Sequence, residues 1–202
     1  MLTTRQSCNN SVDASFHVQS SRRSLFANCW ILCDRNVRMN DRLNFFDKVV
    51  SSVACFAAAQ RTIYQHDLNM LDVSFRRLTR QIVGPPGGLD WSQPIHNILH
   101  IWHERLHYVL DKTSIKPWSR ITLQRYWQMA AYIAGLPSDR WVRRVLAWRP
   151  HGRRSRGRPC YTWESKLVAF CELAQLGCWL DAARDARAWN SMMQDFVSFV
   201  LT

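Results

Sequence analysis

The chain has 202 residues, of which 47% are apolar, enough to build one core of ordinary size or two small ones. This composition excludes a chain that is disordered throughout. The net charge of +12 comes from 23 arginines and 4 lysines against 15 acidic residues. Because arginine suits bidentate contacts with phosphate, a polyanion such as RNA or DNA is the expected partner. A base-composition bias in the coding DNA is the alternative reason for the excess of arginine over lysine.

The cysteines are odd in number, irregularly spaced and without a C-x-x-C pair, at Cys8, Cys29, Cys33, Cys55, Cys160, Cys171 and Cys178. This pattern argues against both a zinc ribbon and a disulfide framework, and it fits a reducing compartment. The apolar run at 25–33 is too short for a secretory signal or a membrane span. We therefore expect a nuclear or cytoplasmic protein that is not secreted and does not contact a membrane.

The predicted elements begin after a Ser/Asn-rich segment at residues 1–37, which we expect to be fragmentary. From residue 40, apolar side chains recur every three or four positions, which predicts helices over 43–57, 64–82, 95–109 and 121–133. The Gly/Pro run at 84–88 ends the second of these, and Gly135 ends the fourth. No segment shows the two-residue alternation of a strand.

Three further helices are predicted towards the C-terminus. Ser138 can cap a short helix that Pro150 ends, with Trp141 and Trp148 on its buried face and arginines on its flank. Thr162 caps a helix over 163–176, and 179–200 carries near-ideal spacing for one long helix. The expected fold is therefore all-α, an irregular bundle of six to seven helices with an extended Arg-rich loop.

Arginine supplies eight of the twenty residues from 139 to 158, where Asp139 is the single acid. Glycine and proline at 152, 157 and 159 hold the backbone out of helix, so the arginines there fan out from an extended ribbon. A core cannot bury so many unpaired cations. The candidate nucleic-acid-binding residues are Arg140, Arg143, Arg144, Arg153, Arg154, Arg156, Arg158 and Tyr161. Tyr161 could stack on an unpaired base, whereas Trp163, at a helix start, is expected to anchor the ribbon in the core.

Two other motifs leave alternatives open. The Arg-Gly-Arg-Pro run at 156–159 matches the core of an AT-hook, whose glycine lets the backbone approach the floor of a minor groove. His103-Glu104-x-x-His107 matches the H-E-x-x-H pattern of zinc peptidases. A catalytic zinc also needs a third protein ligand, and the extended pattern would place histidine at Thr113. The expectation is therefore no metal and no cofactor, with His96, His100, His103 and His107 forming a polar flank of their helix.

The motifs from residue 141 onward occur in a recognisable order. Trp141 and Trp148 precede the G-R-R-x-R-G-R-P run at 152–159, Thr162-Trp163-Glu164 follows, and the series ends with Trp179, Asp185, Trp189 and Phe196. This order resembles the C-terminal region of endonuclease–reverse transcriptases from non-LTR retrotransposons. Upstream, 42–49, 71–84 and Asp90-Trp91 resemble the thumb of that family and its linker. Ala131 and Tyr132 depart from the glycine and histidine of the family pattern.

The resemblance covers residues 38–202 and implies a thumb-like helical region at 38–135, an Arg-rich helix and ribbon at 136–162 and a C-terminal helical pair at 163–202. Reverse transcriptases hold two metal ions with aspartates that include an adjacent pair. No two acidic residues are adjacent in this chain, so we expect no polymerase activity. The resemblance implies a non-catalytic fragment that binds nucleic acid; a pseudogene product without selected function remains the alternative.

Overall fold

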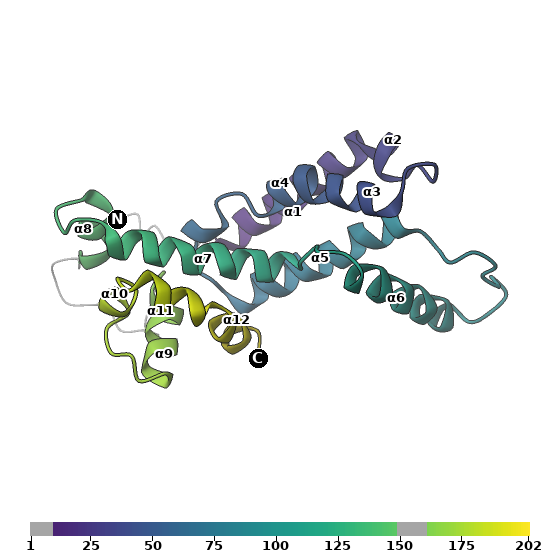
Figure 1. Cartoon of the computed structure of the whole chain (residues 1–202). Coiled ribbons are helices and arrows are strands. Elements are labelled where there is room, and N and C mark those ends of the chain that lie inside the picture. The colour runs from purple at the N-terminus through teal and green to yellow at the C-terminus, as the bar shows by residue number, and fades with distance from the viewer. Residues whose placement is uncertain (1–9, 149–160) are drawn as a thin grey trace, which may run out of the picture. The chain divides into compact units, whose positions relative to one another are not determined.

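The computed structural model describes residues 10–148 and 161–202 (Figure 1), and these residues contain helices and no strand. The helices are α1 (Asn10–Ala27), α2 (Cys29–Leu32), α3 (Met39–Phe46), α4 (Ser52–Ala54), α5 (Gln65–Val83), α6 (Ile95–Asp111), α7 (Trp118–Gly135), α8 (Trp141–Ala147), α9 (Ser165–Leu173), α10 (Trp179–Ala182), α11 (Ala186–Ser191) and α12 (Met193–Leu201). A π-helical turn (Asp47–Ser51) joins α3 to α4, and a 3₁₀ turn (Ala58–Gln60) follows α4. The all-α prediction is confirmed, but the helices outnumber the six to seven expected, because two predicted helices are divided and because α1 and α2 lie in the N-terminal segment, where no helix was predicted.

The described residues form two compact units. The first comprises the described residues of 1–56 together with Tyr64–Ile121, and the second comprises Ala57–Ile63 with the described residues of 122–202. This division differs from the boundaries expected from the sequence, because α7 contributes its first turn to one unit and its remainder to the other. No helix among the described residues is long and apolar enough to cross a membrane.

The segment expected to be fragmentary contains α1, which packs against α4 and α5. Ala14, Val18 and Leu25 are buried on one face of α1, and the wholly buried Ser21 donates its hydroxyl to the Val18 carbonyl at 2.7 Å. Small residues fill much of this face, so its apolar periodicity is weak although its packing is close. The expectation of a fragmentary element over residues 10–27 was therefore wrong.

An aromatic cluster forms the centre of the first unit. The fully buried Trp118, at the start of α7, lies 6.1 Å from the Phe46 ring and 5.8 Å from the Phe75 ring, centroid to centroid. Its indole Nε1 donates to Ser51 Oγ at 2.8 Å, which satisfies the one polar atom of the ring. Towards the C-terminal end of α5, the buried Arg42 donates from Nη1 to the Ile82 carbonyl at 2.9 Å.

The predicted face of α5 is confirmed, because its apolar residues at 68, 71, 75, 78 and 82 are all buried. The helix ends at Gly84, whose φ of +69° lies in the region that favours glycine. The face predicted for α6 is confirmed only in part: Ile98 and Leu106 are buried, whereas Ile95 and Leu99 are exposed. The apolar periodicity identified which side of each helix faces the core, but it did not show how much of that side other elements bury.

The second unit is built around Trp127 of α7 and Trp189 of α11, both fully buried. Their rings are stacked with centroids 3.7 Å apart and planes at 4°. The contact is reciprocal: Trp127 Nε1 donates to the Trp189 carbonyl at 2.9 Å, and Trp189 Nε1 donates to the Trp127 carbonyl at 3.1 Å. Phe196 of α12 packs on the Trp127 ring at 4.6 Å.

The helix predicted over 179–200 is divided into α10, α11 and α12 (Figure 1). Asp185 has an extended backbone, and its side chain accepts hydrogen bonds from the backbone N–H groups of Arg187 and Ala188. This N-cap starts a new helix at Ala186, and it competes with helix continuation through the same stretch. The prediction of one continuous helix was therefore wrong, although the apolar face is largely kept.

Helix α9 is shorter than predicted, since it begins at Ser165 and ends at Leu173. Thr162 does not cap it; instead the Thr162 backbone N–H donates to Ser165 Oγ at 2.8 Å. Gln175, with φ of 55°, and Gly177, with φ of 72°, turn the chain out of the helix.

Candidate nucleic-acid interface

The candidate interface includes α8, a helix of seven residues that follows the turn after α7. Arg140 stands at the N-cap with φ of −63° and ψ of 139°, and its guanidinium, which has no acceptor atom, provides no capping hydrogen bond. Its backbone N–H donates to the Pro137 carbonyl at 3.1 Å. The sequence suggested that Ser138 caps this helix, but the turn places Arg140 at the N-cap position instead.

No residue of α8 is buried. Trp141 is 72% exposed and Trp148, just beyond the helix, is 64% exposed. The prediction that these tryptophans lie on a buried face was wrong. A helix of two turns presents too little surface to dock firmly, and its apolar and cationic positions are interleaved. The result is an exposed aromatic surface next to guanidinium groups.

The three arginines of this region differ in their contacts. The Arg144 guanidinium lies over the Trp141 ring, 5.8 Å from its centroid, in a cation–π arrangement. Arg143 is half-buried and donates from Nη1 to the Ala134 carbonyl at the end of α7, at 3.5 Å. Cations are favoured near the carbonyl end of a helix, so Arg143 helps hold α8 against α7. Arg140 is exposed and makes no side-chain hydrogen bond or ion pair with the described residues.

Trp141, Arg144, Val145 and Trp148 line a surface pocket of about 430 Å³. A flat aromatic wall and a guanidinium plane are the groups on which an unpaired nucleobase stacks. Sequence reasoning missed this pocket because it assigned the tryptophans to the core. The signal that could have revealed it is the shortness of the segment between Pro137 and Pro150.

Of the ribbon residues, the structure describes Tyr161 but not Arg153, Arg154, Arg156 or Arg158, which lie outside the described ranges together with the AT-hook-like run. Tyr161 is 39% exposed, and partial burial raises the pKa of its phenol. Trp163 donates from Nε1 to the Ala59 carbonyl at 2.8 Å, and its ring lies 4.6 Å from that of Tyr126, whose hydroxyl donates to the Trp163 carbonyl. The half-buried Trp163 is therefore held by Ala59 and Tyr126, whereas the ribbon that it was expected to anchor lies outside the described residues.

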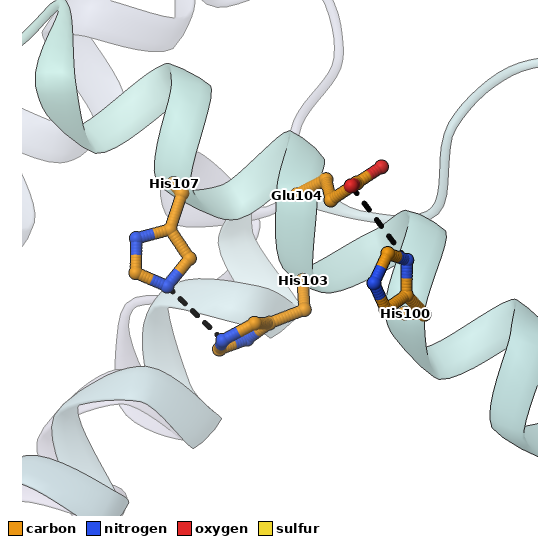
Figure 2. Close-up of polar contacts among 4 residues, drawn as sticks. All are labelled: His100, His103, Glu104 and His107. Carbon is orange, nitrogen blue, oxygen red and sulfur yellow. Dashed lines mark hydrogen bonds and ion pairs between the residues drawn. The ribbon is translucent and has the colours of Figure 1, made fainter.

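Three of the four histidines of α6 take part in two separate contacts, one between two histidines and one between a histidine and a glutamate (Figure 2). His103 and His107 face each other with their Nε2 atoms 3.0 Å apart, while His100 Nδ1 lies 3.7 Å from Glu104 Oε1. Partial burial lowers the pKa of His103, and the positive charges of His107 and the arginines of α5 add to that effect. Among the described residues, no three His, Cys, Asp or Glu side chains converge as a metal site. Within residues 10–148 and 161–202, the geometry offers His103 and His107 no third protein ligand of the kind that a zinc peptidase needs.

In comparisons with known proteins, no family model, no curated protein and no solved structure matches this chain.

Proposed function

We propose that this chain is a non-catalytic nucleic-acid-binding segment that binds RNA and DNA through arginine–phosphate contacts with little sequence specificity. The observation that carries the proposal is the exposed surface of α8, where Arg144 lies over Trp141 beside Arg140. A net charge of +12 adds a long-range attraction for polyanions. The order of the motifs supports an origin in the C-terminal region of a non-LTR retrotransposon reverse transcriptase.

The two kinds of side chain contribute different parts of the binding. Arginine contacts to phosphate release condensed counterions and carry no base information, so they give affinity without sequence preference. The indole face of Trp141 offers stacking to any unpaired base, worth roughly 1–3 kcal/mol per base. A base in a duplex is already stacked, so the tryptophan favours single strands.

The test of the phosphate contacts is the triple variant R140A/R143A/R144A, measured against single-stranded RNA and duplex DNA at several salt concentrations. We expect the slope of log affinity against log salt to fall by up to about 0.9 per lost contact on the duplex, hence by up to ~2.7. The matched control R35A/R38A/R187A removes three exposed arginines from other helices and loops with the same change in net charge. Equal slopes for the two triple variants would refute the assignment to α8.

The test of stacking is Trp141→Ala. We expect single-stranded RNA to bind ~5- to 100-fold more weakly, from the 1–3 kcal/mol of one stacked base. Duplex DNA affinity should change by less than about twofold. Because Trp141 is 72% exposed, the helical content and thermal stability should be retained. Equal losses on both nucleic acids would show that Trp141 acts through the shape of α8 and not through stacking.

A further inference from the structure

A second pocket lies in the first unit, between one face of α1 and one face of α5, with a volume of about 440 Å³. On α1, the lining residues run from Ser15 to Arg22 at helical spacing, and on α5 they run from His66 to Arg77. The buried Val18 and the half-buried Met70 form an apolar floor, and Val73 lies at the rim with 45% of its surface exposed. The volume falls within the range typical of small-molecule sites, ~300–1,000 Å³.

The hydrogen bonds of the unit show that α1 and α5 run in the same direction. His17 and Ser24 of α1 contact the carbonyls of Val53 and Val49 respectively, so α1 is antiparallel to the segment from α3 to α4. That segment is antiparallel to α5 in turn, because Arg42 contacts Ile82 while Phe46 contacts Phe75. The helices α1 and α5 are therefore parallel. Arg22 and Arg77, each the last lining residue of its helix, lie at the same end of the pocket.

The charge at this end is uncompensated. Among the described residues that line the pocket there is no aspartate or glutamate. Neither Arg22 nor Arg77 makes a side-chain hydrogen bond or ion pair with the described residues. An anion bound at this end of the pocket would offset the positive charge of both guanidinium groups and accept charge-assisted hydrogen bonds from them. Gln19, Asn69 and His66 supply further polar groups along the walls.

We propose that this pocket binds a phosphate ester, with the phosphate at the Arg22/Arg77 end and the attached sugar or base along the apolar floor. The source of the phosphate is either a free mononucleotide or the backbone of a nucleic acid. The proposal is independent of the one for α8, because the described residues that line this pocket all belong to the other compact unit. The part of mononucleotide binding that depends on Arg22 and Arg77 should therefore persist in the variant R140A/R143A/R144A.

The experiment measures binding of three probes by calorimetry at low salt: inorganic phosphate, adenosine 5′-monophosphate and a twelve-residue oligouridylate RNA. The pocket variant R22A/R77A should weaken binding roughly tenfold or more, since it removes two charge-assisted contacts. The control R23A/R76A removes the neighbouring arginine on each helix, neither of which lines the pocket, with the same change in charge. It should change affinity by less than about twofold.

A second variant covers the case in which R22A/R77A alters the fold. Val73→Glu places a negative charge at the exposed rim and should abolish binding, whereas Gln81→Glu, exposed on the same helix outside the pocket, should not. Loss of phosphate and mononucleotide binding identifies a free ester as the ligand, and loss confined to the RNA identifies the backbone. The proposal is overturned if the parent protein binds none of the probes, or if pocket and control variants behave alike.

Discussion

The reciprocal contact of Trp127 and Trp189 makes a quantitative prediction for the replacement Trp189→Phe. This change keeps an aromatic ring in the stack but removes the Nε1–H donor that reaches the Trp127 carbonyl at 3.1 Å. It also removes part of the indole from a position that is 0% exposed. The hydrogen bond from Trp127 Nε1 to the backbone carbonyl of residue 189 remains available. The change in the free energy of unfolding therefore reports only the loss of one donor and the reduction in side-chain volume.

The expected magnitude follows from two contributions. Loss of one buried hydrogen bond, whose acceptor is a carbonyl within α7, costs about 0.5–1.5 kcal/mol. The side chain shrinks by roughly 40 Å³, and at about 24 cal/mol per Å³ of residual cavity this costs another ~1 kcal/mol. The free energy of unfolding should therefore fall by about 1.5–2.5 kcal/mol. Trp189→Ala, which removes the whole ring, should cost about 3–5 kcal/mol.

The measurement is a urea titration followed by far-ultraviolet circular dichroism, with Trp141→Phe as the matched control. Because Trp141 is 72% exposed, the control should change stability by less than about 0.5 kcal/mol. If Trp189→Phe destabilises the protein no more than the control does, the reciprocal pair does not hold the second unit together.

Three further predictions concern the remaining titratable and polar groups. Folding lowers the pKa of His103 from its ordinary 6.5, so the unfolded chain binds that proton more tightly than the folded chain does. The free energy of unfolding should therefore decline as the pH falls below about 6.5. His103→Gln should make this decline less steep, as measured by urea titrations at several pH values. Burial, with the nearby Cys178, raises the pKa of the Cys171 thiol to about 11. Iodoacetamide at about pH 8 should therefore label the exposed Cys178 in the folded protein and Cys171 only in denaturant, as read by peptide mapping. Equal labelling of the two thiols in the folded protein would contradict this prediction. The Asp72 carboxylate accepts hydrogen bonds from the backbone N–H of Ser119 at 3.0 Å and from its hydroxyl at 2.6 Å, in the first turn of α7. Asp72→Ala should therefore lower the free energy of unfolding by about 1–2 kcal/mol in the same urea assay. A change below about 0.3 kcal/mol would show that these two hydrogen bonds are energetically neutral.

The candidate site shows how far sequence reasoning reached. The arginines of α8 were chosen as candidates because a high local density of charge can be read directly from a sequence. Trp163 packs against Tyr126, as a tryptophan at the start of a helix was expected to do, but the ribbon that it was to anchor lies outside the described residues. The pocket of Trp141 and Trp148 was missed, as was the pocket between α1 and α5. The second pocket includes Arg22 and Arg77, which are 55 positions apart and line one pocket only because α1 packs against α5. The role of these surfaces in binding stays a prediction.

The sequence by itself determined that the described chain is helical and which side of α5 faces inward, since apolar spacing near 3.6 residues leaves no other regular structure able to bury that side. Only the tertiary structure decided which tryptophans are core and which are surface. Trp141 and Trp189 both stand at helical spacing among apolar neighbours, yet one is 72% exposed and the other is buried against Trp127. Periodicity defines a face of a helix, whereas burial requires another element to cover that face, and the covering element is separated from it in sequence by a distance that no local pattern encodes.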